Sequence, residues 1–146
     1  MQIVGNWWLC DDGTPRPTLE ANVRAADGKL VRERFLVDSG ADHTVLSAAL
    51  QEKLQLPLQP TPVGVSLQGV GGNPSFTVVN AVLELIRDDG GHAHIRGDFA
   101  VLTELAAVEF SLVGRDVLDH FDLIVSRRRG EVLLLGGNHR YAVAQA

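Results

Sequence analysis

Apolar and polar residues alternate one by one in the first third of the chain, and this pattern restricts the possible folds most. Between Thr18 and Ala26 every second residue is apolar, namely Leu19, Ala21, Val23 and Ala25. A period of two is that of a half-buried β-strand, because successive side chains point to opposite faces. Asp27-Gly28 supplies the backbone conformations of a tight turn, and Val31 to Val37 predicts the returning strand.

The rest of the chain continues as short strands with little helix. Strands are predicted over the alternating Val63, Val65 and Leu67, over Phe76 to Ile86, over His92 to Leu102, and over Leu123–Val125 and Val132–Leu135. Helix is predicted from Ser47, a possible N-cap, to Leu54, and for one or two turns within Val117 to Phe121. Such an order predicts a mostly β domain, either a sandwich or a barrel.

Size and composition limit the remaining choices. With 146 residues, the chain is predicted to form a single domain over 1–146, too small for two lobes. Its 45% hydrophobic and 21% charged residues are typical of a soluble globular protein. The net charge of -5 gives no footprint for nucleic acid or an anionic membrane, so neither is expected as a partner.

The cysteine content and the N-terminus bear on the compartment. Cys10 is the one cysteine, which excludes an intrachain disulfide and a cysteine zinc cluster and fits a reducing compartment. The first residues carry no basic region, and no apolar run approaches the length of a membrane span. We therefore expect a complete, cytoplasmic protein.

The segment most informative about chemistry follows the second strand. The apolar residues Phe35, Leu36 and Val37 lead directly into Asp38-Ser39-Gly40. A carboxylate at the end of a buried strand can be held by nearby hydroxyl and N–H donors while one face stays open to a ligand. Hydrolysis by such a group needs a second carboxylate, one ionised to accept a proton from water and one protonated to polarise the scissile carbonyl.

Three segments in order resemble the retropepsin-like aspartic proteases. Residues 35–46, with the motif Asp-Ser-Gly-Ala-Asp-x-Thr-Val-Leu, are similar to the active-site signature of that family. Gly69-Val70-Gly71-Gly72 resembles its glycine-rich flap tip, and residues 112–118 resemble the apolar-Gly-Arg-Asp segment that opens its helix. Each motif alone is a weak signal, whereas three in the right order are a strong one.

The resemblance implies a role for each matching residue. Asp38 would be the catalytic aspartate, the Ser39 hydroxyl would lock two active-site loops together across a dimer, and Gly40 would line the floor of the cleft. The substrate-binding residues would be Ala41, Asp42, His43, Gly69, Val70, Gly71 and Gly72, the last four as a flap that closes over the peptide. The residues that support the site would be Thr44, Gly114, Arg115 and Asp116.

Two details of this correspondence concern the residues after Gly40. Asp42 would contact the main chain of the substrate and pair with Arg115, whose planar guanidinium suits a buried carboxylate better than a lysine would. His43 departs from the retroviral pattern, in which an acidic residue is common at this position. Side-chain specificity therefore does not carry over from the family.

The implied enzyme is a homodimer of closed, mainly antiparallel β-barrel-like subunits with one or two short helices. The sequence contains one Asp-Ser/Thr-Gly, so a second copy of the chain must complete the pair of carboxylates, and a two-fold axis would place Asp38 opposite Asp38. Two carboxylates that lie so near each other should share one proton. We expect an aspartic endopeptidase that cleaves extended peptides at mildly acidic pH and needs neither cofactor nor metal.

The C-terminal strands resemble those of cellular retropepsin domains of the DNA-damage-inducible type and their bacterial relatives. By that analogy, the residues expected near the two-fold axis are Leu123, Val125, Val132 and Leu134. Trp7-Trp8 would pack either into the dimer interface or over one end of the barrel. Arg127-Arg128-Arg129 is interpreted as a solvated hairpin tip.

Other functions remain open at this stage. The same fold and motif would also suit a non-catalytic dimeric module that binds peptides or acts as a scaffold, or a monomer that assembles on demand. A nucleophilic pair of Ser39 and His43 lacks an elbow motif and an oxyanion loop. His92 and His94 share one face of a strand, but no cysteine or acidic partner stands at a fixed spacing, so they are interpreted as surface histidines.

Overall fold

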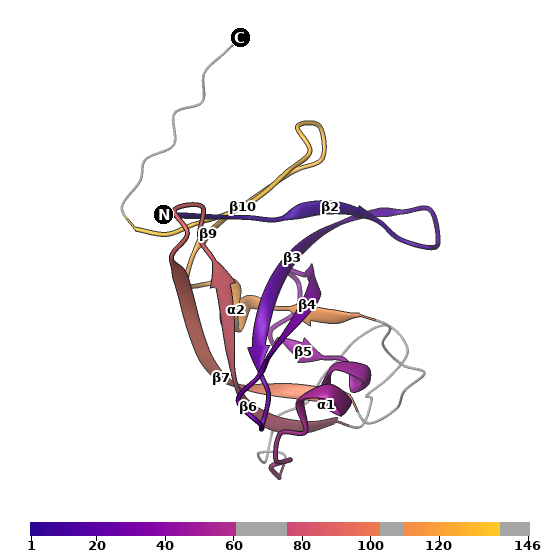
Figure 1. Cartoon of the computed structure of the whole chain (residues 1–146). Helices are drawn as coiled ribbons and strands as arrows, with labels where there is room; N and C mark the ends of the chain where they lie inside the picture. The colour runs from indigo at the N-terminus through magenta and orange to yellow at the C-terminus, as the bar shows by residue number, and fades with distance from the viewer. Residues whose placement is uncertain (61–75, 103–109, 138–146) are drawn as a thin grey trace.

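A computed structural model describes residues 1–60, 76–102 and 110–137. Within these ranges the chain forms ten strands and two short helices (Figure 1). Their bounds are β1 Gln2–Val4, β2 Asn6–Leu9, β3 Pro15–Arg24, β4 Leu30–Val37, β5 Val45–Leu46, α1 Ala48–Leu54, β6 Phe76–Ile86, β7 His92–Leu102, β8 Ser111–Val113, α2 Arg115–Leu118, β9 Asp122–Ser126 and β10 Glu131–Leu135. Neither described helix is long and apolar enough to span a membrane.

The larger sheet closes on itself into a barrel. Its strand order is β2-β3-β4-β8-β5-β7-β6, and a further antiparallel pairing joins β6 back to β3 through Asn22↔Glu84 and Val23↔Leu83. The pairs β4–β8 and β5–β7 are parallel, and the other pairs are antiparallel. The predicted closed, mainly antiparallel fold is therefore confirmed. Its interior is filled by aliphatic side chains and by Phe35 and Phe99.

The two ends of the described chain meet in a separate sheet of order β1-β10-β9. In Figure 1, the β9–β10 hairpin and β2 lie above the barrel. Trp7 joins β2 to that hairpin, because its indole Nε1 donates to the carbonyl oxygens of Ser126 and Glu131 at 3.2 and 3.3 Å. The Arg127 guanidinium lies over the same ring, at 5.3 Å from its centroid. Trp7 thus packs against its own chain.

Most sequence-predicted elements occur where the pattern placed them. The strands β6 and β7 have the predicted bounds, and Ser47 caps α1 by accepting a hydrogen bond from the N–H of Leu50 at 3.1 Å. The strand predicted from Thr18 begins earlier, at Pro15, because β2 pairs with it. The second helix begins at Arg115 rather than Val117. The predicted alternation at Val63, Val65 and Leu67 lies outside the described residues.

The burial of the C-terminal strands limits which of the four side chains expected near the two-fold axis could contact a partner, and their place relative to the axis stays a prediction. Val132 and Leu134 are fully buried in the core of their own chain, so these side chains are not available to a partner. Leu123 packs against the same core, and only Val125 of the four is exposed. Adjacent residues of a strand point to opposite faces of the sheet. The four residues chosen by family analogy lie on the face of the terminal sheet that turns toward the core. The outward face carries the register row of Val4, Leu133 and Ile124.

Gly5 connects the two sheets at a point of close backbone approach. It lies between β1 and β2, and its N–H donates to the carbonyl of Val132 at 2.7 Å. A Cβ at this position would lie 2.3 Å from the carbonyl oxygen of Thr18 and 2.7 Å from Cδ2 of Leu19. Only glycine therefore fits without a shift of the backbone.

We predict that Gly5→Ala destabilises the protein by about 1–3 kcal/mol, the usual cost of overpacking a filled site. The measurement is the free energy of unfolding in denaturant, with circular dichroism at low denaturant to show that the variant folds. A variant that unfolds at the wild-type midpoint would contradict the close approach.

Candidate active site

Asp38 stands immediately after β4, where the barrel strand gives way to a turn. Its N–H donates to the carbonyl of Val113, the last residue of β8, at 3.0 Å, which continues the parallel β4–β8 pairing by one residue. The N–H of Gly40 donates to Oδ1 of Asp38 at 3.0 Å, and the N–H of Ala41 donates to the Asp38 carbonyl at 3.2 Å. The half-buried carboxylate is thus held by its own turn.

The turn is anchored by a buried hydrogen-bond network around Thr44. The N–H of Thr44 donates to both carboxylate oxygens of Asp116 at 3.0 Å, and its hydroxyl donates to Oδ1 at 2.6 Å. The same hydroxyl oxygen accepts the N–H of Gly114 at 3.0 Å. Thr44 is completely buried, so these bonds are shielded from competing water. They fix the Asp38 segment to the start of α2.

Backbone contacts interlock the same two segments. The N–H of Arg115 donates to the carbonyl of Ala41 at 2.8 Å, and the N–H of Asp116 donates to that of Asp42 at 3.3 Å. A Cβ on Gly114 would lie 2.7 Å from the carbonyl oxygen of His43. A glycine is therefore required at this crossing. Two motifs far apart in the sequence form one compact unit.

Asp42 and Arg115 form the expected ion pair, but in a different environment. Nη2 of Arg115 lies 3.4 Å from Oδ1 of Asp42, and the two side chains are 55% and 72% exposed. A buried carboxylate was expected at Asp42, and this expectation is wrong for the single chain. Water screens such a pair, so it contributes little to stability by itself.

The structure brings Asp38 to Thr44 together with Gly114 to Asp116 in one place. Within that group Ser39 and His43 are exposed on the surface of the turn. The predicted flap residues, Gly69, Val70, Gly71 and Gly72, lie outside the described residues. The roles assigned to all these residues remain predictions.

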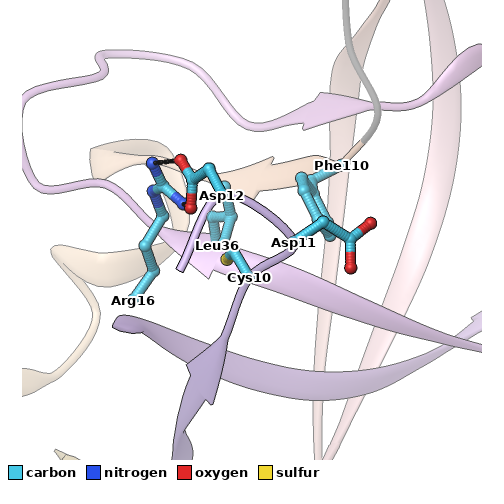
Figure 2. A pocket seen from close by; sticks show the side chains of 6 residues that line it. All are labelled: Cys10, Asp11, Asp12, Arg16, Leu36 and Phe110. Carbon is cyan, nitrogen blue, oxygen red and sulfur yellow. Dashed lines mark hydrogen bonds and ion pairs between the residues drawn. The ribbon is translucent and has the colours of Figure 1, made fainter. Parts of the chain in front are cut away.

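A pocket of about 340 Å³ opens beside the segment that leads to Asp38 (Figure 2). Its lining residues are Cys10, Asp11, Asp12, Arg16, Leu36 and Phe110. Leu36 lies two residues before Asp38 on β4, and Phe110 directly precedes β8, the partner of β4. Sequence reasoning missed this pocket, since its residues come from three separated segments and carry no motif.

The charged part of the pocket is an ion pair between Asp12, in the β2–β3 turn, and Arg16, at the start of β3. Nη1 and Nη2 of Arg16 donate to the two carboxylate oxygens of Asp12 at 3.0 and 2.6 Å, as Figure 2 shows. The guanidinium, followed by the N–H of Thr14, holds the pKa of the Asp12 carboxyl well below its usual range. Asp12 therefore stays ionised throughout the pH range in which proteins are normally studied. This pair leaves Asp11 as the second acidic group of the lining.

The barrel and the Asp38 turn define a retropepsin-like aspartic protease fold. Residues 21–138 match the family described as aspartyl protease, and the chain belongs to that family. No curated protein matches the chain.

Comparison with solved structures finds proteins that resemble this chain. The EIAV protease complexed with the inhibitor HBY-793 is 26% identical, with a TM-score of 0.51 over 71% of this chain and 86% of the other. A retropepsin-like aspartic protease from Rickettsia conorii is 17% identical, with a TM-score of 0.57 over 92% of this chain and 90% of the other. A weaker match is the retroviral protease-like domain of Ddi1 from Leishmania major, at 17% identity and a TM-score of 0.45, over 81% of this chain and 94% of that one.

We predict that Thr44→Val destabilises the protein by about 1–3 kcal/mol, although the side chains have nearly the same volume. The variant loses the hydroxyl donor to Asp116 and leaves the buried N–H of Gly114 without its acceptor. The measurement is the free energy of unfolding. Thr44→Ser, which keeps the hydroxyl, should recover most of the loss.

The matched control for this substitution is Thr14→Val. Thr14 is exposed in the β2–β3 turn, so the same chemical change there should alter stability by no more than about 0.5 kcal/mol. Equal losses in Thr44→Val and Thr14→Val would refute the anchoring role of the buried hydroxyl.

Proposed function

We propose that the chain is an aspartic endopeptidase that acts as a homodimer, with one domain of residues 1–146 in each subunit. The observation that carries the proposal is the Asp38 turn, which presents a half-buried carboxylate on a rigid support. General aspartic protease function follows from the family. The dimeric arrangement and the peptide substrate are the proposed part.

The number of carboxylates calls for a second copy. The chain has one Asp-Ser-Gly, and peptide hydrolysis by this chemistry uses two carboxylates with different protonation. A two-fold axis beside Asp38 would supply the second from the same sequence. The exposed Ser39 hydroxyl would then be free to bond across the axis.

The reaction assigned to the pair is general acid–base hydrolysis. The ionised Asp38 takes a proton from a water molecule whose oxygen bonds to the scissile carbonyl carbon. The protonated Asp38 of the partner subunit gives its proton to the carbonyl oxygen, so a neutral tetrahedral diol forms. The C–N bond then breaks as the amide nitrogen takes a proton from one carboxyl and the diol returns a proton to the other.

The pocket beside β4 suits a side chain of the bound peptide. Leu36 and Phe110 offer apolar surface, and Asp11 adds a negative charge near Asp12 and Arg16. An extended peptide running past Asp38 would place one side chain every second residue on this side. The acidic rim favours a long side chain with an apolar stem and a positive end, such as lysine or arginine.

An apolar row on the terminal sheet is the surface proposed for dimer contact. Val4, Leu133 and Ile124 lie side by side on the outward face of β1, β10 and β9. Val4 is 56% exposed and lies on the edge strand β1. An uncovered apolar residue on an edge strand favours pairing with another chain. In the dimer, the row of one subunit would pack against the same row of the other subunit across the two-fold axis.

We predict that Asp38→Asn abolishes cleavage while the fold stays intact, because an amide cannot accept the proton of water. The assay is cleavage of a diverse mixture of unfolded peptides, read by mass spectrometry at high enzyme concentration. The control variant Asp119→Asn makes the same change at an exposed position and should keep full activity.

The wild-type rate should be highest at mildly acidic pH, because one carboxyl of the pair must carry a proton to give to the scissile carbonyl oxygen. A rate still rising above about pH 8 would contradict the shared proton. If the wild type is dimeric in the assay buffer and neither it nor Asp38→Asn cleaves any peptide, the chain is a peptide-binding module instead.

We predict that Val4→Asp weakens dimerisation at least tenfold, because two desolvated carboxylates would face each other near the axis. Sedimentation equilibrium measures the dissociation constant, and the rate per subunit should become more dependent on concentration. Leu30→Asp is the control, since Leu30 is similarly exposed but lies at the start of β4, outside the terminal sheet. An unchanged dissociation constant in Val4→Asp would exclude this face as the interface.

A further inference from the structure

Two histidines and a buried glutamate gather on the outer face of the barrel. Glu84 lies on β6 and faces its direct antiparallel partner His94 on β7, while His92 lies diagonally across, two residues away on the same side. Glu84 is only 6% exposed, whereas the histidine side chains are 46% and 56% exposed. The glutamate is thus at the bottom of a small cluster that the two imidazoles cover.

The ligand-type atoms of this cluster already point toward one another. Oε2 of Glu84 lies 3.1 Å from Nε2 of His94, and Oε1 lies 3.7 Å from Nδ1 of His92. One atom from each of the three residues can be chosen so that all lie within 4.8 Å of one another. The strand register therefore supplies the acidic partner that inspection of the linear sequence did not find.

The charge of Glu84 is not balanced by a fixed cation. Among residues 1–60, 76–102 and 110–137, no lysine or arginine lies within ion-pair distance of its carboxylate. The side-chain amide of Asn22, on β3, donates to Oε1 at 3.3 Å and orients the carboxylate from its other side. Burying an ion without a fixed charged partner is costly, so the carboxylate depends on the two imidazoles and on Asn22 for its stabilisation.

We propose that Glu84, His92 and His94 bind a divalent transition metal of the zinc type. Two imidazoles and one carboxylate are the ligands that such ions prefer, and three protein ligands leave a fourth position for water. The exposed histidines give that position access to solvent. Asn22 is a positioning residue, which holds a ligating carboxylate as outer partners do in known metal sites.

The ligand atoms lie near the spacing that this ion requires. Zinc binds imidazole nitrogen and carboxylate oxygen at about 2.0–2.2 Å, so tetrahedral ligand atoms lie about 3.3 Å apart. The contacts of 3.1 and 3.7 Å reach different oxygens of Glu84, and one ligand atom from each of the three residues lies within 4.8 Å of the others. The two exposed imidazole rings would therefore have to turn inward to reach tetrahedral spacing around one ion. Magnesium and calcium prefer an all-oxygen shell and are not expected to bind.

The site lies on the seam that closes the barrel. Asn22 and Glu84 are one of the two residue pairs that join β3 to β6, and His94 extends the same row to β7. A bound metal would therefore tie β6 to β7 directly and hold β3 through the Asn22 amide. This role is separate from hydrolysis and does not depend on the proposed protease mechanism.

The test is binding of zinc to the tag-free, metal-stripped full chain, measured by isothermal titration calorimetry at neutral pH. One zinc per chain should bind, and cobalt should give the visible spectrum of a tetrahedral site. Magnesium should give no heat at the same concentrations. The melting temperature should rise with zinc in the wild type.

Variants locate the site. His92→Asn and His94→Asn should each weaken zinc affinity at least tenfold, and Asn22→Ala should weaken it about tenfold through loss of the carboxylate's orientation. His120→Asn removes an exposed histidine elsewhere and should bind zinc as the wild type does. Glu84→Gln, at a nearly buried position, is interpreted only if its circular dichroism matches the wild type.

Two results would overturn the proposal. One is a wild type that binds zinc no more tightly than the double variant with His92→Asn and His94→Asn. The other is binding that magnesium competes away, which would indicate an all-oxygen site elsewhere. Neither result depends on Asp38, so the test of the metal site and the test of the protease function are independent of each other.

Discussion

The barrel depends on one short seam, where β6 returns to β3. Only Asn22↔Glu84 and Val23↔Leu83 pair across it, yet without them the larger sheet would remain open along two edges. One pair stabilises the inner face of the barrel and the other pair stabilises the outer face. Val23 and Leu83 are buried and contribute to the core, while the Asn22 amide and the Glu84 carboxylate bond on the outside. Closure thus combines hydrophobic burial with a polar contact.

The Asp38 turn gains its rigidity from the strands that this closure holds in place. β4 delivers Asp38, and β8, paired with it, delivers Gly114 and the start of α2. Thr44 and Asp116 then tie the two outgoing segments together. The carboxylate is therefore positioned by the barrel on one side and by a buried hydrogen-bond network on the other. Such support from rigid elements is what a catalytic group requires, because small displacements lower rates sharply.

The sequence was sufficient for features that repeat locally. The turn residues that flank β6 and β7 predicted the bounds of these strands, and the three motifs around Asp38, Gly71 and Gly114 predicted the fold. Features that depend on neighbours in space were missed. Pro15 and Pro17 concealed the start of β3, since β2 pairs with it there, and the pocket beside Leu36 has no motif. The burial of Val132 and Leu134 in the core of their own chain was not predicted either, because it depends on which face of β10 turns inward.

The two ends of β7 serve different parts of the molecule. Near its C-terminal end, Ala100 and Val101 pair with β5, which directly follows the Asp38 turn. Its first residues carry His92 and His94, and His94 is six residues, about 20 Å of strand, before Ala100. A charge at the start of β7 is therefore too distant to influence the Asp38 carboxylate through water-screened electrostatics. A metal bound there would act on barrel closure, and through it on stability, while the chemistry of each assembled site would stay the same.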